Sequence, residues 1–516
     1  MSKDRQTAQK KRFSSASGGF TLPPAALSTT LIIYLALTAG LAVVMQLTGT
    51  PIVGVLGAIT INLIVLFFMR SELALPLYLA VAGPSVALSL GSSGILSRLY
   101  IGNLLFFMVT ATWILLRLLP NRKSGEQLLP PALLFPLLSL IVMGLISIVA
   151  SHLFPDPNVS YAFPHSNTPL IITNAAEMML LVGLPMFLVV VPGVVRSIRH
   201  AHWTINAYML VGVLYALGTI FAQPLGLTST EEILGVKRPM VFGSVSSALG
   251  TLLVLFTSIA FCQALYAISN SRRLLWYALT GLFALGVIMT FGRESWIGLF
   301  ISIMTITALY TRNIKMLIAI VALVLPLLLV TGASNFFDPS KTYGSDRLKI
   351  WQDAITIWQH SPIVGVGAGN FQFFDLVYGK DVVGVAHNQY LQMLAEMGVP
   401  GLIILIWAMV AVGWICAKRF RAAQTQLGKS IALAYIGYFA SIIFGGFFTS
   451  SFVPSAASGG GTEAFVQASY RWLLLGLVLS IPNWERETAS ETTDPESAQK
   501  TGPQLQREPA LPLPEL

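Results

Sequence analysis

Charged residues are scarce in this chain of 516 residues: only 10% are Asp, Glu, Lys or Arg, whereas 55% are hydrophobic. A water-soluble domain usually carries about 25% charged residues, which cover its surface. The mean hydropathy is +0.73, and the apolar residues fall into runs close to membrane-spanning length. The composition therefore excludes a soluble enzyme, a nucleic-acid-binding domain, a coiled coil and a disordered scaffold. It predicts a polytopic membrane protein.

Cysteine is almost absent, since the chain has only Cys262 and Cys416, and both lie inside apolar runs. Neither a disulfide framework nor a zinc site can be built from them. The sequence also lacks an HExxH motif, and its loops lack the paired carboxylates that glycosidases use. We therefore expect no bound metal and no cofactor.

The net charge of +9 has two possible explanations. A basic surface can bind nucleic acid, but in a membrane protein an excess of Lys and Arg marks the cytoplasmic loops. Most of the 31 basic residues fall in the N-terminal tail and in alternate loops. We interpret the excess as this topological signal, which predicts cytoplasmic N- and C-termini and no nucleic-acid partner.

A series of apolar runs predicts transmembrane helices, because in lipid a helix satisfies its own backbone polar groups. We expect an all-α fold with about 12–14 spans. The runs lie at 26–47, 51–69, 72–90, 101–119, 131–150, 171–193, 201–221, 240–267, 274–291, 295–311, 315–332, 399–417, 430–450 and 468–483.

These runs divide the chain into five parts. The expected order is a basic cytoplasmic tail over 1–25, helices 1–11 over 26–332, a periplasmic helical loop over 333–398, helices 12–14 over 399–483, and a tail over 484–516. The last part is rich in Glu, Thr, Ser, Gln and Pro, so we expect a disordered cytoplasmic tail.

The long periplasmic loop predicts structure of its own. Ser345 or Asp346 can cap a helix at its start. Spacings of three and four predict that the inward face of this helix comprises Leu348, Trp351, Ile355 and Trp358. A glycine-rich turn follows at 361–370, and a second helix is expected to begin near His387 and stop at Gly398.

Three arginines and this histidine are expected on the same, outer side of the membrane: Arg238, Arg293, Arg347 and His387. Positive charge there opposes the insertion bias and is costly near membrane depth. Guanidinium groups grip a diphosphate through bidentate hydrogen bonds. A histidine at the N-terminus of a helix is expected to be neutral, which suits the removal of a proton from a hydroxyl group. The constellation predicts a site for a lipid diphosphate.

Each of these residues also has a simpler interpretation. The arginines can snorkel to the membrane interface. Glu294 can neutralise Arg293, and Asp346 or Asp353 can pair with Arg347 at the surface. His387 can be an ordinary interfacial residue at the start of a helix.

Five segments of the chain resemble the O-antigen ligase and polymerase superfamily. They are the Thr-Phe-Gly-Arg-Glu-Ser-Trp hairpin at 290–296, the segments at 347–354 and 365–371, the His-Asn-Gln-Tyr-Leu motif at 387–391 and the Glu-Met-Gly-Val-Pro-Gly motif at 396–401. The resemblance is clearest over about residues 235–420, and the last two motifs are its most specific part.

The resemblance implies a metal-independent, inverting glycosyltransferase of the membrane-embedded GT-C type. Its donor would be a glycan on undecaprenyl diphosphate, and its acceptor a hydroxyl group of a glycan, lipid or protein at the outer face of the bacterial inner membrane. By this resemblance, the diphosphate would be bound by Arg238, Arg293 and Arg347. His387 and Arg293 would be catalytic, and Asn388 and Trp351 would support the loop.

A transporter of lipid-linked sugars or of inorganic carbon is the alternative from another class of protein, and a non-catalytic envelope scaffold is a third. A transporter needs ionisable residues deep within several helices, or an internal repeat. The predicted helices carry little such charge apart from Glu177. Ligase and polymerase activities are not distinguished by the sequence.

Overall fold

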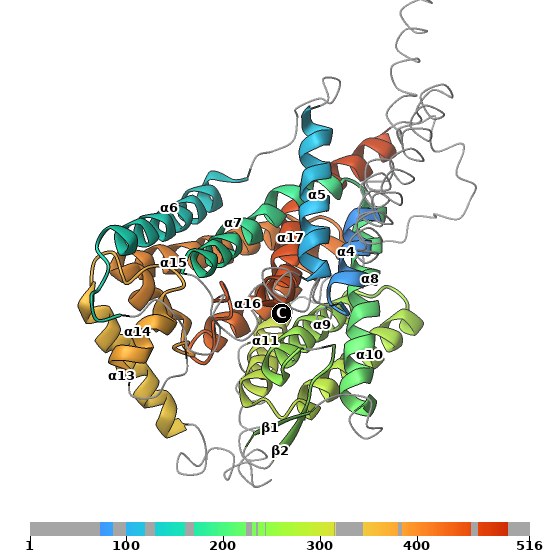
Figure 1. Ribbon diagram of the computed structural model, residues 1–516. Coiled ribbons are helices and arrows are strands. Elements are labelled where there is room, and N and C mark those ends of the chain that lie inside the picture. The colour runs from blue at the N-terminus through green and yellow to red at the C-terminus, as the bar shows by residue number, and fades with distance from the viewer. Residues whose placement is uncertain are drawn as a thin grey trace, which may run out of the picture.

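The computed structural model describes residues 73–85, 100–118, 129–159, 170–222, 230–233, 236–242, 244–313, 315, 344–379, 384–455 and 463–493. Most of these residues lie in helices (Figure 1). Nine helices in the described part of the chain are long and apolar enough to cross a membrane. The expected all-α, multi-pass membrane fold is therefore confirmed.

The nine candidate spans follow the predicted apolar runs. They are α6 (Pro131–Leu153), α7 (Leu170–Val194), α8 (Ile198–Leu217, continued by the π-helical turn η3, Gly218–Ala222), α9 (Ser246–Leu265), α10 (Asn270–Met289), α11 (Arg293–Thr311), α15 (Gln389–Ala422), α16 (Gln426–Gly445) and α17 (Glu463–Thr493). The runs expected at 26–47 and 51–69, and all but one residue of 315–332, lie outside the described residues.

The predicted run at 72–90 gives a short helix within the described residues. Helix α4 (Ala74–Ala82) has nine residues, which extend for only about 13 Å. A bilayer core is about 30 Å thick, so the described part of the 72–90 run does not span it. Helix α5 (Ile101–Leu118) has 18 residues and contacts α4 and α7.

Helix α17 lies in the centre of the bundle, where it contacts α7, α8, α9 and α16 (Figure 1). Its Tyr470 is fully buried, and the hydroxyl group donates a hydrogen bond of 2.6 Å to the carbonyl of Leu79 in α4. The same hydroxyl accepts a 3.0 Å bond from the N–H of Gly83, and Tyr208 of α8 donates to the Tyr470 carbonyl at 2.6 Å. Buried polar atoms are therefore used to join three helices inside an apolar core.

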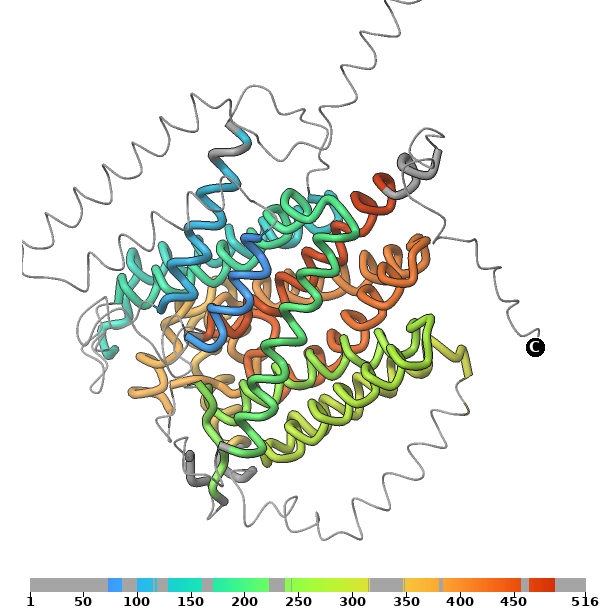
Figure 2. Tube along the Cα trace, turned by 90° about the vertical axis from the view of Figure 1, so that its right-hand side faces the viewer, coloured from blue at the N-terminus to red at the C-terminus, as the bar shows by residue number. Residues whose placement is uncertain are grey.

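A second group of helices carries part of the site. Helix α9 lies against both α10 and α11, and α16 packs on α9 and α11 (Figure 2). The α9–α11 contact is close because Gly250 lacks a side chain: a Cβ there would meet the buried Ser295 Oγ at 2.0 Å. This packing fixes the first turn of α11, which contains Arg293.

Helices α13 (Gly344–His360) and α14 (Phe371–Tyr378) lie at one end of the bundle beside α15 (Figure 1). The glycine-rich turn between them is bound to α6 and α7 through Asn370. The Asn370 side chain donates to Ser151 Oγ at 3.1 Å and accepts from Asn174 at 2.8 Å. Asn174 also donates to the carbonyl of Ala368 at 2.8 Å. The turn is thus held by a buried polar network, not only by apolar contact.

The first helical segment of α15 stops at Gly398, as expected, and a second segment follows directly after this kink and runs to Ala422. Gly398 has φ +67°, and a Cβ on it would lie 2.2 Å from the Ile363 carbonyl oxygen, so glycine is required. The next N–H, from Val399, donates to Pro362 at 3.0 Å. Pro400 then suits the first turn of the new helical segment, and the chain resumes the helix at once.

The face predicted for α13 is wrong by about one residue, or 100°. The buried stripe comprises Ile350, Ala354 and Ile357, whereas Ile355 is 40% exposed. Trp351 is half-buried beside this stripe. The helix begins at Gly344, so the two candidate caps, at 345 and 346, lie within its first turn. Amphipathic spacing alone did not locate the face because α13 is covered by both α14 and α15.

Helix α17 also extends past the point where a disordered tail was expected. It runs to Thr493, and Trp484 is fully buried. The Glu485 carboxylate accepts hydrogen bonds of 2.9 and 2.8 Å from the backbone N–H groups of Gln424 and Thr425. These contacts bind the extension to the α15–α16 turn. Residues 494–516 lie outside the described part.

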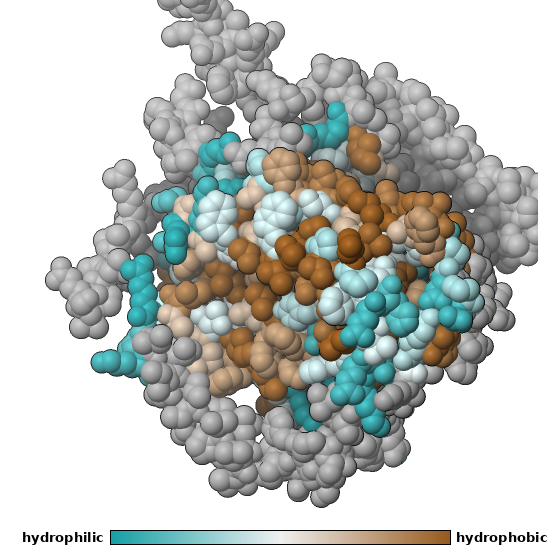
Figure 3. All heavy atoms as spheres, turned by 90° about the vertical axis from the view of Figure 1, so that its left-hand side faces the viewer, coloured by the Kyte–Doolittle hydropathy of each residue, from teal (hydrophilic) through white to brown (hydrophobic). Residues whose placement is uncertain are grey.

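One surface of the molecule is consistent with immersion in lipid. Apolar residues occupy the middle of the face shown in Figure 3, and hydrophilic residues gather toward its margins. Helix α6 contributes exposed apolar side chains, among them Phe135, Leu138 and Leu145. An exposed apolar surface of this kind is expected where a protein meets lipid instead of water.

Candidate functional site

The first arginine of the expected site lies on a β-hairpin that the apolar pattern did not predict. Strand β1 (Thr230–Ile233) pairs antiparallel with β2 (Val236–Pro239), and Arg238 is on β2. Adjacent residues of a strand point to opposite faces. Accordingly, Lys237 is exposed, whereas Arg238 is half-buried and its Nε has no hydrogen-bond partner among the described residues. A buried donor without a partner is costly and is available to an anion.

The second arginine begins helix α11, after a tight turn from α10. Phe291 adopts φ +52° in this turn, and Thr290 Oγ1 accepts a 3.3 Å bond from the N–H of Gly292. Arg293 follows as the first helical residue. Both Arg238 and Arg347 interact electrostatically with it. The structure therefore brings all three arginines together, at a helix N-terminus that adds positive potential of its own.

The third arginine joins the loop helices to this turn. Arg347 on α13 lies 3.7 Å from the Glu294 carboxylate, with side-chain exposures of 31% and 17%. Its guanidinium carbon lies 5.8 Å from the ring centre of Phe448, just after α16. Glu294 thus contacts Arg347, and its charge also acts on Arg293, as the sequence suggested. Among the side chains described at this site, the three guanidinium groups carry more charge than the Glu294 carboxylate neutralises.

His387 lies directly before the N-cap of α15, in the same electrostatic neighbourhood. Burial, and after it the positive charge of Arg347, lower the pKa of His387 to about 4. The imidazole is therefore neutral at pH 7, as expected, but burial is the main cause, where the sequence suggested the helix dipole. His387 has φ +47°, a backbone conformation that is uncommon for residues other than glycine.

Asn388 supports the histidine by capping α15. Its side-chain oxygen accepts hydrogen bonds of 3.0 and 3.2 Å from the N–H groups of Tyr390 and Leu391. Asn388 thus fixes the backbone turn directly after His387. Trp351, the other residue expected to support the loop, has a buried Nε1 without a hydrogen-bond partner among the described residues.

Two further residues hold the backbone next to His387, and neither was identified from the sequence as part of the site. The Gln392 side chain accepts a 2.7 Å bond from the N–H of Ala386 and donates at 2.8 Å to the buried carboxylate of Glu396. Glu396 also accepts a bond of 3.3 Å from the N–H of Phe371. The i, i+4 spacing of Gln392 and Glu396 placed them on one helical face. Their common partners, however, come from segments that only the folded chain brings near.

Within the residues that the structure describes, no group of three or more His, Cys, Asp or Glu side chains could hold a metal ion. The polar groups of the site are instead guanidinium and imidazole groups. Such a set can bind a doubly charged anion and exchange a proton with a neighbouring hydroxyl group.

Comparison with known proteins finds a family match over part of the chain. Residues 278–406 match the family model described as O-antigen ligase. This match includes Arg293, Arg347 and His387, whereas Arg238 precedes it. No curated protein matches the chain. A chain from a solved peptidoglycan synthase complex aligns with 15% identity and a TM-score of 0.41, covering 70% of this chain and 100% of that chain.

The fold and the site together define a multi-pass α-helical membrane protein with a cationic site at one end of its bundle. The match over residues 278–406 supports membership of the O-antigen ligase and polymerase superfamily. This match supports an O-antigen ligase-like, glycan-processing function at a membrane.

Proposed function

We propose that this protein is an inverting glycosyltransferase that needs no metal ion. It transfers or polymerises a glycan from undecaprenyl diphosphate to a hydroxyl acceptor at the outer face of the inner membrane. The proposal is carried by one observation: three arginines interact around the first turn of α11, and one of them also acts on a neutral histidine. An anionic leaving group and a proton acceptor are the two requirements of this chemistry.

In the proposed reaction, the acceptor oxygen attacks the anomeric carbon of the donor sugar from the face opposite the diphosphate. The new glycosidic bond forms as the bond from that carbon to the diphosphate oxygen breaks. His387 accepts the hydroxyl proton, and undecaprenyl diphosphate leaves with the electron pair of the broken bond. Arg238, Arg293 and Arg347 stabilise the negative charge that grows on the leaving oxygen.

Donor binding also changes the pKa of His387, the proposed general base. In the free protein, Arg347 contributes to the low pKa of His387. A bound diphosphate brings negative charge beside these groups, which opposes the effect of Arg347 and raises the pKa of the imidazole. His387 thereby becomes a better proton acceptor only when donor is present, which limits unproductive protonation of the empty site.

The proposed orientation places the α13–α14 end of the bundle in the periplasm and both termini in the cytoplasm. Cys262 and Cys416 are buried, so cysteines introduced at exposed positions can be labelled selectively. A membrane-impermeant thiol reagent applied to intact spheroplasts should label Gln359→Cys, at an exposed position of α13, and should not label Ser271→Cys, at the far end of α10. The opposite pattern would reverse the topology.

The activity test uses purified protein in lipid vesicles with an undecaprenyl-diphosphate-linked glycan and a hydroxyl acceptor. We expect transfer of the glycan in the presence of EDTA, and loss of transfer in Arg293→Ala. Movement of the donor across the vesicle membrane without glycan transfer would instead identify a transporter. In a deletion strain, retained single repeats without long chains would indicate a polymerase, and free polymer without its anchor would indicate a ligase.

A further inference from the structure

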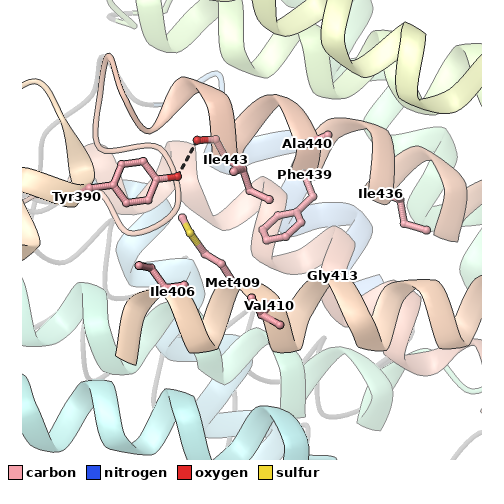
Figure 4. Close-up of a pocket in the computed structure, with 9 residues that line it drawn as sticks. All are labelled: Tyr390, Ile406, Met409, Val410, Gly413, Ile436, Phe439, Ala440 and Ile443. Carbon is pink, nitrogen blue, oxygen red and sulfur yellow. Dashed lines mark hydrogen bonds between the residues drawn. The ribbon is translucent and has the colours of Figure 1, made fainter. Parts of the chain in front are cut away.

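An apolar groove lies between α15 and α16, close to the site but outside the cation cluster (Figure 4). Its volume is about 380 Å³, which falls in the range of ligand-binding pockets, roughly 300–1,000 Å³. The lining residues are Tyr390, Ile406, Met409, Val410, Gly413, Ile436, Phe439, Ala440 and Ile443. Only Tyr390 among them has a polar side chain.

One side of the groove faces outward from the protein. Ile406 is 46% exposed, Val410 64% and Ile443 40%. Met409 and Phe439 are buried and form its inner surface. In a membrane-spanning helix pair, exposed apolar residues of this kind contact lipid chains. The groove can therefore be entered sideways from the bilayer by a hydrocarbon chain.

The end of the groove near Tyr390 lies close in the chain to residues of the cationic site. Tyr390 lies three residues after His387, and its hydroxyl group donates a 2.7 Å hydrogen bond to the carbonyl of Ile443 (Figure 4). Its ring lies 4.8 Å from the ring of Phe447. The next residue, Phe448, is the one that Arg347 approaches. A path of neighbouring residues thus connects the groove to the arginines.

We propose that the α15–α16 groove binds the headgroup-proximal part of the donor's polyprenyl chain and so aligns the diphosphate with the arginine cluster. The proposal rests on the proposed function, because it assumes a prenyl diphosphate donor. The two neighbouring surfaces define the occupant. The arginine cluster can bind an anion, and the apolar groove can bind a branched hydrocarbon chain. Holding both the prenyl chain and the diphosphate restricts the orientation of the donor before the acceptor arrives.

Gly413 provides a way to fill the groove with little disturbance. A Cβ at this position would meet only Phe439, at an ordinary contact distance of 3.7 Å. Gly413 is separated from Ile406 by seven helical residues, or about 10 Å, so it lies at the end of the groove away from Tyr390. Gly281 on α10 is a matched control, because a Cβ there meets nothing within 4 Å.

The experiment compares Gly413→Leu with Gly281→Leu in the vesicle transfer assay, using two donors with the same glycan. One donor carries the undecaprenyl chain, and the other a two-isoprene chain that is too short to reach Gly413. We expect Gly413→Leu to raise KM for the long donor at least tenfold and to change KM for the short donor less than twofold. Gly281→Leu should behave as the wild type with both donors.

A second variant tests the groove independently, in case Gly413→Leu does not fold. Val410→Trp adds bulk at the exposed side of the groove and should give the same selective loss with the long donor. Unchanged KM for the long donor in both groove variants, or equal losses with both donors in correctly folded protein, would overturn the proposal. If the wild type uses neither donor, the proposed function itself fails and the groove assignment falls with it.

Discussion

The two ends of the helical bundle both carry basic residues, but in different environments. At the far ends of α10, α11 and α15, the side chains of Arg273, Arg312 and Arg421 are exposed. At the other end, which we call the site end, Arg238 and Arg347 are half-buried and both act on Arg293. Exposed cations at loop ends are sufficient to explain membrane insertion. Membrane insertion does not explain why the site end brings partly buried cations together, where they repel one another.

The comparison indicates that the site end stores electrostatic repulsion that an anion would relieve. Bringing like charges together lowers stability unless a ligand compensates. The exposed far-end cations Arg273, Arg312 and Arg421 need no such compensation, because water screens each of them. A substitution at the site end should therefore affect activity, whereas a matched substitution at the far end should not.

The largest expected effect comes from the histidines. His387→Ala should reduce the transfer rate by about 10²–10⁴-fold, the usual contribution of a general base. His202→Ala removes an exposed histidine at the far end, in α8, and should leave the rate unchanged. Initial rates in vesicles at equal amounts of folded protein provide the measurement. Equal rates for the two variants would remove His387 from the mechanism.

The next expected effect distinguishes the arginines. Arg293→Ala should reduce the rate by about 10²–10³-fold, because one donor to the developing anion is lost. Arg273→Ala, at the other end of α10, should retain wild-type activity. Both proteins should insert normally, which size-exclusion chromatography in detergent can verify. A similar loss in both variants would indicate a general effect of charge on the membrane protein.

A smaller effect is expected from the residues that hold the His387 loop. Gln392→Met removes the acceptor of the Ala386 N–H while it keeps the length of the side chain. We expect kcat to fall by roughly tenfold with little change in KM, since an unpaired buried donor costs about 1–3 kcal/mol. Gln424→Met, an exposed far-end glutamine, is the control. A rise in KM without loss of kcat would assign Gln392 to donor binding.

The smallest predicted effect is a shift in pH dependence. His387 must be deprotonated to accept a proton, so activity is lost as the pH falls through its pKa. In the free protein this value is about 4, partly because of Arg347. Arg347→Gln removes that positive charge, so the acidic limb of kcat/KM should move to higher pH by about one unit or less. Arg312→Gln should not move it. A shift to lower pH would contradict the assigned electrostatics.

The sequence predicted the spans well, since apolar runs and membrane-spanning length are both local properties. Helices α6 to α11 and α15 to α17 lie where runs were expected. The short turn before Arg293 and the neutral state of His387 were also expected. The family resemblance is supported by the match over residues 278–406, whereas the roles of the individual site residues remain predictions.

The features that were missed depend on contacts between distant segments. The buried face of α13 is set by α14 and α15, and the extension of α17 by Glu485 at the α15–α16 turn. The stop at Gly398 was expected, but the hydrogen bond from the next N–H to the carbonyl of Pro362 was not. The Gln392 contact was not predicted because the N–H of Ala386 reaches it only after the loop has closed. The periodicity of apolar residues describes one helix at a time, so it does not predict contacts between distant segments.

The central claim is that the site-end arginines bind a diphosphate, and direct binding tests it most simply. Undecaprenyl diphosphate, without sugar, would be titrated into wild-type protein, Arg293→Ala and Arg273→Ala in nanodiscs with EDTA present. We predict that the wild type and Arg273→Ala bind the diphosphate equally and prefer it to undecaprenyl monophosphate. Arg293→Ala should bind at least about tenfold more weakly, as expected for a lost charged hydrogen bond. Equal binding by all three proteins, or no preference for the diphosphate, would contradict the claim.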